Sequence, residues 1–259
     1  DDGETSWLLV EPGCAAGLME WLVRMRFRMQ VDIDEVSSQW TVLATTGPVP
    51  DGVSSPAIWH DPWPSIGRGS VGYGPSPHPG EGLEVVYWIY PRVELTAELA
   101  PAWAGTEALD ALQVRAARPR LVADVDEKTL PHELDWLRTA IHLEKGCYRG
   151  QETIAKVHNL GHPPRRAVLL HLDGSDAELP VAGAEVHLGD KVVGTVTRVA
   201  RHYEWGPIAF AVVKRTVDPD ATLDVDGPDG PIPASQEILV APDSGATRRE
   251  AIKQARSGR

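Results

Sequence analysis

The second half of the chain is a series of short apolar segments separated by turn residues. Beyond Pro163-Pro164, segments rich in β-branched residues follow one another at intervals of about ten residues, with Gly, Pro and Asp between them. These segments are 167–174, 184–190, 191–200, 206–214 and 221–227. Such spacing is typical of a small antiparallel barrel or sandwich. The pattern therefore predicts a C-terminal β domain over 163–242.

The first half mixes helical and strand patterns, so we expect an α+β fold. Apolar residues at three- and four-residue spacing predict a helix over 12–30. We also predict helices from an N-cap at Thr106, from Pro131 to Gly146, and from Gly150 through 161. Alternating or apolar stretches predict strands, and a loop rich in Pro and Gly covers 47–82. The predicted strands are 31–37, 39–48, 56–63 and 82–91.

The composition is that of a globular protein in a reducing compartment. Of 259 residues, 42% are hydrophobic and 24% are charged, which suffices for one large or two ordinary cores. Cys14 and Cys147 lie far apart, which disfavours a disulfide scaffold. The net charge of −12 argues against nucleic-acid binding through a global field, and no apolar run approaches the roughly 20 residues of a membrane span. We expect a soluble, cytoplasmic monomer without direct nucleic-acid or membrane contacts.

Residues 145–152, KGCYRGQE, combine a thiol with residues that a simple turn does not need. In a turn just before a helix, the Cys147 thiol would lie where the helix dipole and the Lys145 cation both favour thiolate. Tyr148 adds a stacking face, and the two glycines let the backbone approach a ligand closely. A cysteine by itself is more often a buried structural residue. The combination favours a functional thiol.

Basic residues gather in and after this octet. Between 145 and 166 there are five of them against the single acid Glu152, and the same stretch contains His158 and His162. The five are Lys145, Arg149, Lys156, Arg165 and Arg166. This local charge of +4 is either a solvated surface or the seat of a small anionic ligand.

The octet resembles the KGCYxGQE signature of the folate-binding YgfZ family, relatives of the glycine-cleavage T-protein, an aminomethyltransferase. All seven fixed positions of the signature match: Lys145, Gly146, Cys147, Tyr148, Gly150, Gln151 and Glu152. Residues 117–136 and 165–215 resemble the regions before and after it. The resemblance implies an aminomethyltransferase-like folate-binding domain with a mixed sheet and helices, N-terminally incomplete here over 1–162. A small antiparallel β-barrel over 163–242 and a flexible tail over 243–259 complete the implied organisation.

The resemblance also implies a function. It indicates a protein that binds tetrahydrofolate or a one-carbon derivative and supports iron–sulfur cluster assembly or repair and, through it, tRNA modification. Its implied partners are iron–sulfur client or assembly proteins, and no directly bound metal is expected. Glu133 would bind the pterin, because a carboxylate accepts two hydrogen bonds from the amino and ring N–H groups. Cys147 would be the working thiol.

Other residues would complete the folate site. These are Lys145, Tyr148, His162, Arg165 and Arg166. An arginine of the T-proteins falls near His162 here, which leaves open the residue that meets the anionic tail of the folate.

Two alternatives stay open. The chain could be a folate-dependent aminomethyltransferase of the glycine-cleavage type, so the sequence does not decide whether it is an enzyme. It could also be an interaction module in which the octet only shapes a turn.

Overall fold

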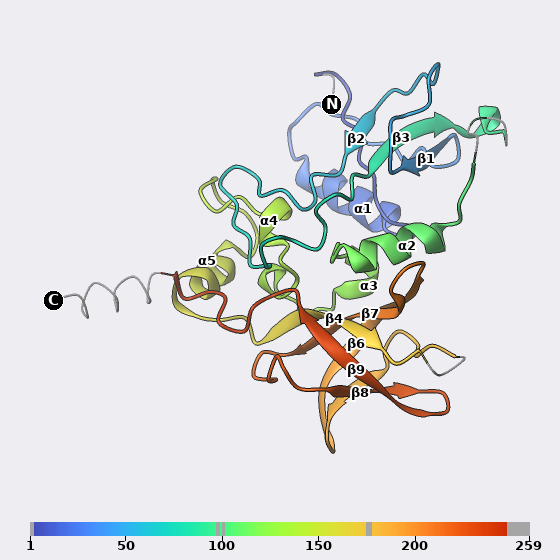
Figure 1. Cartoon of the computed structure of the whole chain (residues 1–259). Coiled ribbons are helices and arrows are strands. Elements are labelled where there is room, and N and C mark those ends of the chain that lie inside the picture. Colours follow the sequence, from blue (N-terminus) through green and yellow to red (C-terminus); the bar gives the residue numbers. More distant parts are fainter. Residues whose placement is uncertain (1–2, 97–98, 100–101, 175–177, 248–259) are drawn as a thin grey trace. The chain divides into compact units, whose positions relative to one another are not determined.

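The computed structural model describes residues 3–96, 99, 102–174 and 178–247. The chain forms two compact units, which Figure 1 shows coloured along the sequence. The first unit comprises 1–61 and 83–103, and the second comprises 62–82 and 104–259. Among the described residues, no helix is long and apolar enough to cross a membrane.

The first unit is a helix and a small antiparallel sheet. Helix α1 (Ala15–Met25) precedes the strands β1 (Trp40–Thr45), β2 (Ile58–His60) and β3 (Val86–Pro91) and the 3-10 helix η1 (Arg92–Glu94). The strand order is β1-β3-β2, with Leu43 opposite Trp88. The helix and these three strands confirm their predictions, with shorter bounds.

The strand predicted over 31–37 does not form. Residues 31–36 adopt no regular structure, and a turn follows at 37–39. The Glu35 carboxylate accepts a hydrogen bond of 2.9 Å from the Ser37 backbone N–H. Acidic side chains that bond to nearby backbone groups compete with strand pairing, and this segment carries three acids among its seven residues.

The helices of the second unit are short. They are α2 (Thr106–Arg115), α3 (Leu121–Asp124), the 3-10 helix η3 (Pro131–Leu134), α4 (Leu137–Ala140) and α5 (Gln151–Leu160). Thr106 is the first helical residue and Gly105 takes the N-cap position, so the predicted Thr106 cap is wrong by one residue. The single helix predicted from Pro131 to Gly146 is also wrong. Asp135 adopts a left-handed conformation with φ 54°, which separates η3 from α4.

The second unit also contains a closed β-barrel, which confirms the β pattern of the sequence. Six antiparallel strands follow in the order β4-β7-β6-β5-β8-β9 among the described residues. Their bounds are β4 (Arg165–Leu172), β5 (Glu185–Leu188), β6 (Lys191–His202), β7 (Gly206–Lys214), β8 (Leu223–Gly227) and β9 (Gly230–Ile238). Val168, Leu170 and Phe210 are fully buried.

Side chains of strand β4 belong to two hydrophobic cores. Val168, Leu170 and Leu172 belong to the cluster that fills the barrel, whereas Ala167 and Leu169 belong to a second cluster with Val114 of α2. Because side chains alternate across a strand, the even-numbered residues point inward and the odd-numbered residues point outward, toward the helices. The domain boundary predicted at Pro163-Pro164 thus lies next to a strand that both cores share.

The segment after β9 packs on α5. The backbone N–H of Ala246, which is 1% exposed, bonds to the Val157 carbonyl, and the Thr247 hydroxyl donates to the His158 carbonyl over 3.1 Å. This part of the tail predicted to be flexible is therefore ordered. Residues 248–259, the remainder of that prediction, lie outside the described residues.

Candidate functional site

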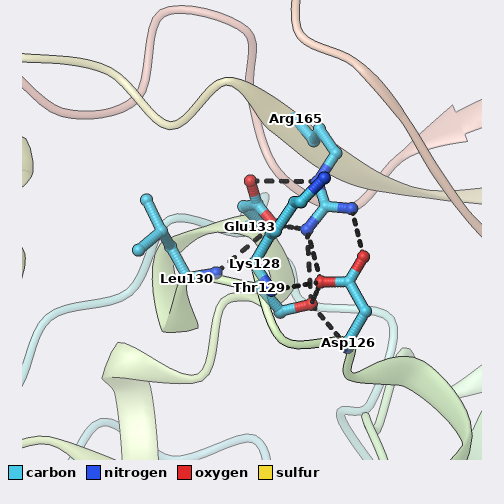
Figure 2. A network of polar contacts seen from close by, with 6 residues as sticks. All are labelled: Asp126, Lys128, Thr129, Leu130, Glu133 and Arg165. Atoms are coloured by element: carbon cyan, nitrogen blue, oxygen red, sulfur yellow. Dashed lines mark hydrogen bonds and ion pairs between the residues drawn. The ribbon is translucent and has the colours of Figure 1, made fainter.

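Glu133 and Arg165 lie together in a dense polar network, which Figure 2 shows. The guanidinium Nε and Nη2 of Arg165 donate to Glu133, with Nη2 at 2.8 Å from Oε2. Nη1 and Nη2 donate to the Asp126 carboxylate over 2.7 and 3.1 Å. The Thr129 hydroxyl accepts a further bond from Nη2. The fold thus brings together two residues that the sequence assigned to one site.

Every guanidinium nitrogen of Arg165 is engaged by this network. The Asp126 carboxylate raises the pKa of Arg165 far above its usual range, and Arg165 in turn holds the pKa of Asp126 well below its own. The Glu133 side chain is completely buried, and it also accepts a hydrogen bond from the Leu130 backbone N–H at the start of η3. Two carboxylates against one guanidinium leave the network with a net negative charge.

Arg166 lies on the other face of β4. It is fully buried, and its Nη2 donates to the Val217 carbonyl over 3.2 Å and to the Gln236 side chain over 2.9 Å. Burial lowers its pKa. Since neighbouring strand residues point to opposite faces, Arg165 and Arg166 do not share a site.

The octet spans the turn before α5 and the first two residues of that helix. Gly150 is the N-cap with φ 83°, a left-handed conformation that favours glycine, and the Ile154 N–H bonds to its carbonyl over 3.1 Å. Cys147 is exposed. The Lys145 ammonium lies 5.2 Å from the centre of the Tyr148 ring, a cation–π contact, and Tyr148 packs against the core that α5 shares with the barrel.

The basic residues around the octet are less concentrated than their sequence suggests. Lys145, Arg149 and Lys156 are exposed, but Arg165 is neutralised by two carboxylates and Arg166 is buried. His162 is tied to the tail, with Nδ1 at 2.9 Å from the Ser244 carbonyl oxygen. The exposed cations therefore lie on the octet and α5.

A buried aromatic cluster connects η3 with α5. His132 is fully buried, with Nε2 at 3.2 Å from the Ile154 carbonyl oxygen and with no hydrogen-bond partner for Nδ1 among the described residues. Its ring lies 5.6 Å from that of Tyr73, whose hydroxyl is 2.9 Å from His158 Nδ1. Burial raises the pKa of Tyr73 to about 12 and lowers that of His132 to about 4.

A second buried network lies under the glycine-rich loop. The Asp135 carboxylate accepts from the Tyr73 backbone N–H and from Arg138 Nε over 2.7 Å, and His78 Nε2 lies 3.5 Å away. A Cβ on Gly74 would lie 2.6 Å from Asp135 Oδ2, so glycine lets the loop rest on this carboxylate.

No sequence pattern assigns Asp126, Thr129, Asp135, Tyr73 or His78 to a site. The local signal for Asp126 and Thr129 is a side-chain turn, since the Asp126 carboxylate accepts from the Lys128 backbone N–H. Asp135, Tyr73 and His78 have no such signal, because their contacts span more than fifty residues of sequence.

No family model matches the chain, and no curated protein matches it. Among solved structures, the chain is similar to glycine cleavage system aminomethyltransferase T from Bartonella henselae, at 21% identity and a TM-score of 0.49. The alignment covers 64% of this chain and 47% of that protein, so the chain spans about half its length. Any assignment of function rests on the residues of the chain itself.

Proposed function

We propose that this chain is a tetrahydrofolate-binding accessory protein that supports iron–sulfur cluster assembly or repair and, through it, tRNA modification. The observation that carries the proposal is the octet KGCYRGQE, whose seven signature residues span the turn that exposes Cys147 and the first two residues of α5. Helix η3, which carries Glu133, contacts this same helix through His132. The proposed thiol and the proposed pterin carboxylate thus belong to one packed substructure.

In this proposal the Glu133 carboxylate binds the pterin in place of its present partner, Arg165. Arg165 offers its carboxylate neighbouring N–H donors from Nε and Nη2. The amino and ring N–H groups of a pterin form a similar donor pair, so one carboxylate suits either partner. The Arg165 side chain is 28% exposed, which gives it room to turn away. Once released, its guanidinium is available to the anionic tail of the folate.

The binding step predicts that Glu133→Gln weakens tetrahydrofolate binding by about 10- to 100-fold, the range expected for lost charge-assisted hydrogen bonds. The measurement is a titration of the full chain, followed by the fluorescence of its nine tryptophans. Glu127→Gln is the matched control, because Glu127 is an exposed carboxylate in the turn that precedes η3. Equal affinity of both variants would remove Glu133 from the site, and the absence of saturable binding by the unmodified chain would overturn the folate assignment.

The thiol step predicts that Cys147→Ala fails to restore iron–sulfur enzyme activity in cells lacking this protein. Cys14→Ala is expected to restore it, which separates the exposed octet thiol from the general loss of a cysteine. Full rescue by Cys147→Ala would contradict the assigned role. Folate-dependent turnover when glycine-cleavage partner proteins are supplied would instead identify the chain as an aminomethyltransferase.

A further inference from the structure

The outer surface of the barrel carries a histidine between two carboxylates. Glu185 and His187 lie on β5 two residues apart and on one face, because Val186 between them points into the barrel core. Asp226 lies on the neighbouring strand β8, where Val225 is buried and Asp226 is exposed. The three side chains therefore meet on the solvent-facing side of the β5–β8 pair.

The distances among these side chains approach those of a metal site. His187 Nε2 lies 3.2 Å from Asp226 Oδ1 and 3.7 Å from Glu185 Oε2. One ligand atom from each residue lies within 4.8 Å of the other two. Ligands about 2.0–2.1 Å from a tetrahedral Zn²⁺ lie roughly 3.3 Å from one another. The ligand atoms reach this spacing when the two exposed carboxylates close by up to about 1.5 Å.

The strand register supplies an independent reason for a cation here. Val186 pairs with Val225 and His187 with Asp224, so the same antiparallel register places Glu185 opposite Asp226. Like charges at directly opposite positions destabilise a strand pair. His187 Nε2, which faces these carboxylates, is shielded from solvent and makes no well-formed hydrogen bond among the described residues. A metal ion would offset the carboxylate repulsion and give this nitrogen a partner.

The geometry points to a divalent transition-metal site formed by Glu185, His187 and Asp226. An imidazole with two carboxylates suits Zn²⁺ and its neighbours in the first transition series better than Ca²⁺ or Mg²⁺, which favour all-oxygen ligand sets. Three protein ligands leave at least one coordination position to water. This site lies on the barrel surface, is independent of the folate proposal, and departs from the sequence-based expectation of no bound metal.

Calorimetric titration of the full chain with Zn²⁺, after dialysis against a chelator, tests this site. We expect one equivalent to bind. His187→Ala is expected to weaken binding by at least the 10- to 100-fold that loss of a second-shell partner costs. His60→Ala is the matched control, since His60 is an exposed strand histidine in the first unit, and it should bind like the unmodified chain. Unchanged affinity in His187→Ala would overturn the proposal.

Two further measurements exclude simpler explanations. Asp226→Asn keeps the shape of an exposed side chain, so weakened Zn²⁺ binding with an unchanged circular dichroism spectrum attributes the loss to a ligand rather than to unfolding. Ca²⁺ is expected to bind more weakly than Zn²⁺. Equal affinity for the two ions would indicate attraction by acidic groups alone and would count against a site containing His187.

Discussion

Replacing Asp135 with alanine is expected to lower the free energy of unfolding by about 3–5 kcal/mol, the cost of breaking a buried ion pair from one side. Arg138 is 5% exposed, and its Nε and Nη2 both lie 2.7 Å from Asp135 Oδ2. Without this carboxylate the guanidinium keeps the Pro64 carbonyl at 2.6 Å but no counter-charge within this network. The Tyr73 backbone N–H loses its acceptor as well. Urea unfolding followed by circular dichroism measures the loss.

The matched control is Asp190→Ala, which removes an exposed aspartate from the turn between β5 and β6 and should change the unfolding free energy by about 0.5 kcal/mol or less. A double variant, Asp135→Ala with Arg138→Met, should be less destabilised than the sum of its two single variants, because neither charge is then left alone. Strict additivity would show that the two charges do not act as a pair.

Lowering the pH from about 7.5 to about 5 is expected to cost this fold about 2 kcal/mol through His132 alone. Burial lowers the pKa of His132 from 6.5 to about 4. In this window the unfolded chain therefore binds the proton that the folded chain excludes. The contribution to stability is complete above pH 6.5 and is lost progressively as the pH falls toward 4. Urea unfolding at the two pH values measures the difference.

The substitution His132→Phe should remove this part of the pH dependence, because phenylalanine fills the site without a titratable group. His60→Gln, a change to an exposed histidine, should keep the slope of the original chain. If His132→Phe and the original chain lose equal stability between the two pH values, the proton responsible binds elsewhere.

The barrel could be predicted from the sequence because its signal is local. Short strands with turn residues between them require no knowledge of distant contacts. The same alternation could also have separated Arg165 from Arg166, once β4 is known to begin at Arg165. Arg165 and Arg166 are adjacent in sequence, but their side chains point to opposite faces of β4. They therefore do not belong to one basic patch.

The polar networks of the second unit could not be predicted in this way. The turn within the octet and the helix that follows it could be predicted, since Gly150 and the pattern of 151–160 are local signals. Asp135 instead interrupts a helical pattern, and its carboxylate accepts a hydrogen bond from the Tyr73 backbone N–H in a loop some sixty residues earlier. Helix propensities depend only on neighbouring residues. The sequence therefore gives no local signal of the tertiary contacts that override them here.

Strand β4 also determines how the second unit unfolds. Ala167, Leu169 and Phe210 of the barrel wall pack with Val114 and Leu134 of the helical part, and each is 1% exposed or less. A barrel excised at Pro163 would carry this apolar wall into water, where it would favour association over folding. The helices would likewise lose the surface on which they are ordered. Barrel and helices should therefore melt together as one cooperative unit, so that a proteolytic cut between them yields neither fragment in folded form.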